Sequence, residues 1–198
     1  YELLELVLMS AIPRRDVKPL AKTLIAEFGS YAEAISAAPE RLMEISGIGE
    51  NVVTNLKLVE ASAQKLAQGI IMEKPVLSNW QALNNYCTSQ MAYKKNEQFR
   101  VLFLDRQNRL IGDEKMQEGT IDHTPVYPRE IIKRTLELGS TAIILVHNHP
   151  SGNPTPSRED IEMTNKIQEA GKQLGVLLHD HLIISKGGHS SFKMMELI

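Results

Sequence analysis

The sequence has a single cysteine, Cys87, among its 198 residues. One thiol excludes an internal disulfide bond and every zinc site that needs two or more thiolates, and it is typical of proteins in a reducing compartment. Cys87 also shares an apolar stripe at helical spacing with Leu83 and Met91. This pattern predicts a buried structural thiol rather than a nucleophile.

The sequence also lacks a strong excess of charge and a long apolar run. Its formal net charge is -2, so no global basic field attracts nucleic acid, and any contact with DNA needs a local patch. Its apolar runs are far shorter than the roughly 20 residues that cross a bilayer, and no signal segment opens the chain. The chain begins with Tyr1 rather than methionine, which indicates that the natural start is missing. We expect a cytoplasmic protein with no membrane partner.

Two regions of the chain differ in their apolar spacing. Residues 1–70 have the helical spacing of a small all-α domain, whereas residues 71–198 alternate between strand and helix patterns. Gly69 and Pro75 interrupt the helical pattern, which places the domain boundary after residue 70. The second region is therefore predicted to form one layered α/β domain. Its predicted elements are two strands within 99–112, a helix at 127–140, a strand at 141–146, a helix at 157–175 and a strand at 176–185.

Two histidines follow the apolar run at residues 141–146, which has the pattern of a strand buried on both faces. His147 and His149 are two residues apart, so a strand directs both imidazoles to the same side, where they can meet one ion. Asp160 follows in the first turns of the next helix, and a loop rich in proline and glycine can return its carboxylate to that ion. Two histidines and one carboxylate leave a fourth position for water, which is typical of a catalytic zinc site.

Other interpretations apply to the same residues and their neighbours. Ser157 and Asp160 also have the spacing of a helix N-terminal capping box. His179 and His181 form a second His-x-His pair, which we interpret as core histidines or as partners of the metal ligands rather than as a second metal site. Asp180, between them, could orient a ligand imidazole by accepting a hydrogen bond from it.

The stretch "HNHPSGNPTPSRED" resembles the JAMM (MPN+) zinc metallo-isopeptidases in its His-x-His-x(10)-Asp spacing and in the serine three residues before the aspartate. Together with "LLHDHLIIS" and the helical region in front, it makes nearly the whole chain similar to the RadC family. The resemblance implies a cytidine-deaminase-like α/β/α fold, a Zn²⁺ cofactor and the hydrolysis of amide or isopeptide bonds in a peptide or protein substrate. A zinc deaminase is excluded, because its second ligand pair is Cys-x-x-Cys.

The resemblance also implies roles for residues beyond the metal ligands. JAMM enzymes have an upstream glutamate that acts as general base on the zinc water and then as acid toward the leaving amine. Glu97 has the matching place just before the strand at 99–104, and its rivals are Glu114, Glu118 and Glu130. Ser157 is expected to donate a hydrogen bond to the developing oxyanion.

A glycine turn marks the first region. Gly47 and Gly49 flank one apolar residue ahead of a helix, and such a turn presents backbone N–H groups to a phosphate. The region resembles a helix-hairpin-helix domain, which implies a weak DNA contact through residues 45–57. Glu50 stands where that family often has a basic residue, and residues 1–70 hold 7 Lys and Arg against 9 Asp and Glu. The alternative functions are a DNA-associated repair or recombination protein with a nuclease-like or structural metal site, or a helical module for packing and protein contacts.

Overall fold

A computed structural model describes residues 1–72, 75–119 and 126–198 of the chain. The chain forms two compact units, Tyr1–Leu66 and Ala67–Ile198. The boundary between them falls within one long helix, α5 (Glu50–Met72). Gly69, which was predicted to interrupt the helical pattern, lies inside this helix. A glycine in a helix costs only about 1 kcal/mol relative to alanine, so the packing of neighbours such as the buried Ile71 outweighs it.

All the regular secondary structure of the first unit, residues 1–66, is helical. Its core consists of apolar side chains from every helix, among them the fully buried Leu4, Leu24 and Leu56. Gly47 has a φ of 93°, which only glycine adopts readily, and it forms the turn that precedes α5. The helix-hairpin-helix assignment stays a prediction, because helices joined by a glycine turn occur in other folds. The helices are α1 (Glu2–Ala11), α2 (Lys18–Phe28), α3 (Tyr31–Ser36), α4 (Pro39–Met43) and the start of α5.

The second unit contains a five-stranded mixed sheet. Its strands are β1 (Glu97–Leu104), β2 (Leu110–Gly119), β3 (Ala142–Asn148), β4 (Leu177–Ser185) and β5 (Gly188–Ser191). The order across the sheet is β2-β1-β3-β4-β5. The β3–β4 pair is parallel, and the other three pairs are antiparallel. The predicted strands are confirmed, and the short edge strand β5 is an addition that the sequence pattern did not indicate.

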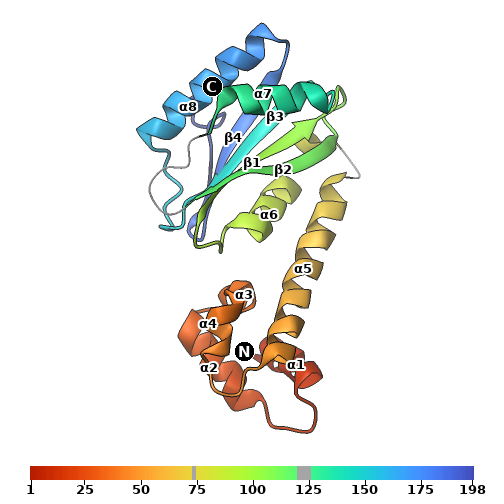
Figure 1. Cartoon of the computed structure of the whole chain (residues 1–198), viewed down its shortest axis with the longest axis vertical. Helices are drawn as coiled ribbons and strands as arrows, with labels where there is room; N and C mark the ends of the chain where they lie inside the picture. Colours follow the sequence, from red (N-terminus) through yellow and green to blue (C-terminus); the bar gives the residue numbers. More distant parts are fainter. Residues whose placement is uncertain (73–74, 120–125) are drawn as a thin grey trace. The chain divides into compact units, whose positions relative to one another are not determined.

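Helices cover both faces of this sheet, as Figure 1 shows. Helices α7 (Pro128–Glu137) and α8 (Arg158–Gln173) lie on one face, and α6 (Trp80–Met91) lies on the other, preceded by the short 3-10 helix η1 (Val76–Ser78). The central strand β3 contributes alternate residues to both cores, with Ile143 and Leu145 facing α7 and α8, and Ile144 facing α6. The prediction of a strand buried on both faces is therefore confirmed, as is the mixed α/β architecture.

Two further features concern individual helices. Helix α8 begins at a capping box, in which the Ser157 hydroxyl accepts from Asp160 N at 3.1 Å while the Asp160 carboxylate accepts from Ser157 N at 2.7 Å. This confirms the predicted cap. Across the described part of the chain, no helix has both the length and the apolar character needed to cross a membrane.

The thiol of Cys87 is buried in the core between α6 and the sheet, with 2% of the residue exposed. Burial raises the pKa of this thiol far above its usual value, with a smaller contribution from the charge of Asp113. We expect native protein to react with iodoacetamide far more slowly than free cysteine at pH 8, and to react fully once unfolded in urea. Alkylation of Cys87 in the native protein at the rate of a free thiol, followed by mass spectrometry, would contradict this assignment.

Candidate metal centre

His147 is a polar residue near the end of β3, a strand whose residues are all buried. His147 pairs in register with Phe99 of β1 and with Ile183 of β4, and only 1% of it is exposed. Strand periodicity places its imidazole on the same face as Leu145, toward α7 and α8. The Phe99 ring stacks on it, with the ring centroids 6.1 Å apart. Both packing and strand geometry therefore fix the imidazole of His147.

His149 and Asp160 complete a set of three converging side chains. The Nε2 atoms of His147 and His149 are 2.9 Å apart. The Asp160 carboxylate lies 3.2 Å from His147 Nε2 through Oδ1 and 3.5 Å from His149 Nε2 through Oδ2. The loop after β3 thus returns Asp160, at the start of α8, to the two imidazoles. The sequence predicted this juxtaposition, and metal binding by the three residues stays a prediction.

The spacing of the three side chains fits a zinc ion. Atoms bound at about 2.0–2.1 Å to a tetrahedral zinc ion lie about 3.3 Å from one another. The two Nε2 atoms are 2.9 Å apart, and each lies 3.2 or 3.5 Å from one oxygen of the Asp160 carboxylate, close to this value. His149 Nδ1 lies 2.9 Å from the Asn153 carbonyl oxygen, which can only accept, so Nδ1 carries a proton and Nε2 is the ring nitrogen that can bind a metal. The residues present therefore fit a divalent cation.

The electrostatics of the site also favour positive charge. Burial alone would raise the pKa of the Asp160 carboxyl, but hydrogen bonds from His147, His149 and Ser157, with the charge of His147, hold it well below its usual range. The hydrogen bond to Asp160 raises the pKa of His149, against the effect of burial. The carboxylate thus stays ionised, and a cation between it and the imidazoles is stabilised.

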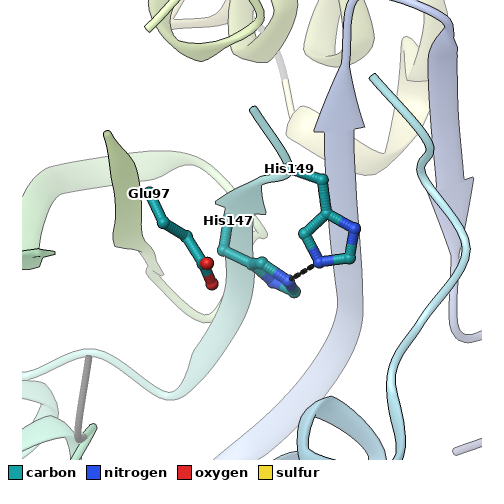
Figure 2. Close-up of side chains that lie close together, drawn as sticks. All are labelled: Glu97, His147 and His149. Carbon is teal, nitrogen blue, oxygen red and sulfur yellow. Dashed lines mark hydrogen bonds between the residues drawn. The ribbon is translucent and has the colours of Figure 1, made fainter. Parts of the chain in front are cut away.

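Glu97 lies beside the two histidines, as Figure 2 shows. One ligand atom from each of Glu97, His147 and His149 lies within 4.8 Å of the others, a grouping that could itself hold a metal ion. Glu97 is the first residue of β1, and its carboxylate points toward the imidazoles from a strand that neighbours β3. This is the place expected of a group that moves a proton to or from a molecule at the metal.

The rival glutamates are engaged elsewhere. Glu114 accepts two hydrogen bonds from the Arg134 guanidinium, which lowers the pKa of the Glu114 carboxyl. Glu118 binds Lys115 and Gln98, and Glu130 pairs with Arg129 on the surface. Among the described residues, the grouping of potential metal ligands includes Glu97 and none of the three rivals.

Asn148 holds the segment that carries Glu97, a role that the sequence analysis missed. Its side chain is fully buried, and its Oδ1 accepts from Gln98 N at 2.8 Å. Its Nδ2 lies 3.1 Å from the carbonyl oxygen of Asn96 and 3.4 Å from that of Lys94, and donates to them. The residues on both sides of Glu97 are therefore bound by one amide. The sequence did offer a signal: Asn148 follows a strand predicted to be buried on both faces, and a buried amide needs hydrogen-bond partners.

A β-bulge in β4 decides which residue of that strand reaches the site. Ile143 pairs with Leu178 and Ile144 with Asp180, so His179 is an extra residue in β4. The bulge reverses the alternation of the strand after Leu178 and turns His181 toward α8.

The predicted role of Asp180 is therefore wrong. Its carboxylate accepts from the Ser191 hydroxyl at 2.6 Å and from Lys193 N at 3.0 Å, and it contacts no metal-ligand candidate. His181 lies against the site instead, with its Nε2 2.7 Å from His147 Nδ1. Thr164 of α8 lies behind it, with Oγ1 2.6 Å from His181 Nδ1. Burial and the charge of His147 hold the pKa of His181 well below its usual value, which keeps this imidazole neutral.

A mixed sheet with helices on both faces and a cluster of potential metal ligands at the end of β3 are consistent with a JAB/MPN-like domain. The family model described as a RadC-like JAB domain matches residues 77–197, and the chain belongs to this family. The chain is 58% identical to a UPF0758 protein of Rhodobacter capsulatus, over all of this chain and 92% of that relative. It is 55% identical to a UPF0758 protein of Ruegeria pomeroyi, over 98% of this chain and 86% of that relative. The RadC resemblance is thus confirmed.

The hydrogen bonds of Asn148 lead to a prediction about stability. We expect Asn148→Ala to lower the free energy of unfolding by about 1–3 kcal/mol, because it leaves buried backbone groups without partners. Urea denaturation followed by circular dichroism measures this change. Asn165→Ala, at an exposed position of α8, is the matched control, and it should change stability by no more than about 0.5 kcal/mol. Equal stability of the two variants would show that the Asn148 contacts are dispensable.

Proposed function

We propose that this protein is a zinc-dependent hydrolase of amide or isopeptide bonds in peptides or proteins. The observation that carries the proposal is the convergence of His147 Nε2, His149 Nε2 and the Asp160 carboxylate within 3.5 Å of one another, with Glu97 beside them. JAB domains are generally hydrolytic and typically bind zinc, which supports this reading of the cluster.

The metal ligands and Glu97 have different roles in the proposed reaction. His147, His149 and Asp160 would hold zinc, which when bound supplies an acidified water and a Lewis acid for a carbonyl oxygen. The Glu97 carboxylate takes a proton from the attacking water at one of its oxygens and returns it to the nitrogen of the leaving amine. Because the imidazole of His147 and the residues flanking Glu97 are held by packing and hydrogen bonds, this geometry needs little rearrangement before reaction.

Ser157 is positioned to serve the substrate carbonyl. Its hydroxyl donates to Asp160 Oδ2 at 2.7 Å, so it lies beside the ligand carboxylate. Ser157 N donates to the same oxygen at 2.7 Å. Asp160 therefore keeps a donor if the hydroxyl turns to the oxyanion of the substrate. The loss of such a donor typically slows catalysis by about 10²–10³-fold.

The contacts of Lys57 speak against DNA binding as the main function. Lys57 is the sole cation in the proposed DNA contact at residues 45–57. Its ammonium donates to the Ile35 carbonyl at 2.8 Å and pairs with Glu60 at 2.9 Å, so it is engaged within its own unit. Since affinity for the DNA backbone depends on cations that are free to neutralise phosphates, this segment has little to offer. A weak contact through the Gly47–Gly49 turn stays a prediction.

The first test is metal content. Protein purified without a polyhistidine tag should contain about one zinc ion per chain by inductively coupled plasma mass spectrometry. The His147→Ala/His149→Ala variant should contain none and remain folded by circular dichroism, because two of the three ligands are lost. Zinc bound equally by both proteins would place the metal elsewhere, and no zinc in either after zinc is added back would refute the proposal.

The second test is hydrolysis itself. Protein is incubated in H₂¹⁸O with denatured bacterial proteins and synthetic ε-lysyl isopeptides, and new carboxyl groups that carry ¹⁸O are identified by mass spectrometry. We expect products from the zinc-loaded protein, and a rate lower by about 10²–10⁴-fold for Glu97→Gln, which keeps its zinc. Glu130→Gln, which removes a surface carboxylate paired with Arg129, is the control and should keep full activity. Full activity of Glu97→Gln would assign the base to another residue.

A further inference from the structure

We propose that His181 and Thr164 are positioning residues that hold the imidazole of His147 with its Nε2 toward the metal position. Both are fully buried, and neither reaches the point where the three ligand atoms converge. They act through a line of hydrogen bonds that starts at a backbone carbonyl of α8 and ends at His147. The inference rests on the proposed function through the metal site alone, and its test does not require a substrate.

The first two hydrogen bonds of this line have a direction that the backbone sets. Thr164 Oγ1 lies 2.6 Å from the carbonyl oxygen of Asp160, which can only accept, so the hydroxyl donates its one proton there. The 2.6 Å contact between Thr164 Oγ1 and His181 Nδ1 then requires the imidazole to donate. The second ring nitrogen of His181, Nε2, faces His147.

The line ends at His147. Its Nδ1 lies 2.7 Å from His181 Nε2, so this contact occupies one of the two ring nitrogens. The other, Nε2, lies beside Asp160 Oδ1 and His149 Nε2. Nε2 is therefore the ring nitrogen of His147 that can reach a metal at this point.

Burial makes these contacts hard to replace. His181 and Thr164 have no exposed surface and His147 has 1%, so water cannot replace a missing partner. Loss of the Thr164 hydroxyl would leave His181 Nδ1 without its partner, and loss of the His181 imidazole would leave His147 Nδ1 without one. Because an unmade hydrogen bond of a buried group is costly, these contacts hold the ring of His147 in one orientation.

The line also closes on the residue that supplies the third ligand. The carbonyl of Asp160 accepts from Thr164, while its carboxylate faces His147 Nε2. Asp160 thus acts on both ring nitrogens of His147: on Nδ1 through Thr164 and His181, and on Nε2 through its carboxylate. The rings of Phe99 and Phe192 hold His181 between them, with centroids at 5.7 and 4.5 Å from it, so His181 cannot turn away easily.

Two matched pairs of variants separate this role from simple packing. His181→Phe keeps a planar ring beside Phe99 and Phe192 but removes the hydrogen-bond partner of His147, whereas His181→Gln keeps a polar group at a similar distance along the side chain. Thr164→Val keeps the shape of the side chain but removes the hydroxyl, and Thr164→Ser retains the hydroxyl. If the side chains only filled the core, His181→Phe and Thr164→Val should be the better tolerated members of each pair.

The measurement is zinc affinity of the full chain by competition with a chromophoric chelator, with thermal unfolding of each metal-free variant as the check on folding. We expect His181→Phe and Thr164→Val to weaken zinc binding by about 10–100-fold, the usual effect of removing a partner of a ligand imidazole. His181→Gln and Thr164→Ser should recover most of the loss. Affinity unchanged in folded His181→Phe and Thr164→Val would overturn the proposal.

The same measurement separates this inference from the proposed function. Wild-type protein that binds no zinc would refute the proposed function. Wild-type protein that binds zinc, with folded His181→Phe and Thr164→Val variants that bind it equally well, would overturn this inference alone.

Discussion

The burial of β3 on both faces is the constraint on which the rest of the site depends. A strand between two helical layers has no side open to water, so each polar residue at its end must find partners inside the protein. His147 and Asn148 end this strand, and alternation sends them to opposite sides. The imidazole meets His149, Asp160 and His181. The amide binds the backbone on both sides of Glu97. One strand end therefore positions both the ligand set and the candidate base.

The start of α8 gives a single carboxylate two functions. Asp160 satisfies the N-terminal backbone of the helix through its capping box, and a negative charge at this end is also stabilised by the helix dipole. The same carboxylate faces the two imidazoles. The structural and the metal-binding interpretations of Asp160 are thus compatible, because a carboxylate has two oxygens and several lone pairs. Folding of α8 therefore fixes where this carboxylate lies relative to the two imidazoles.

Much of the fold could be predicted from the sequence because its patterns are local. The run at 141–146 indicated a strand buried on both faces, and the spacing of Ser157 and Asp160 indicated a helix start. The convergence of His147, His149 and Asp160 was also predicted, since two histidines on one side of a strand and a short stiff loop leave few other arrangements. The position of the boundary within α5 was less predictable, because Gly69 lowers helix propensity without ending a helix that packs well.

By itself, the sequence determined which three side chains form the candidate metal site, since two imidazoles and one carboxylate are brought together by adjacent strand, loop and helix signals. The tertiary structure decided which other residues serve that site. A bulge at His179 turned His181 rather than Asp180 toward His147, and a bulge depends on how two strands pair, not on the residues of one strand. Thr164 reached His181, and Asn148 reached the flanks of Glu97, only because α8, β1, β3 and β4 pack together. Contacts between segments far apart in the chain have no local pattern, and so only the folded protein could reveal them.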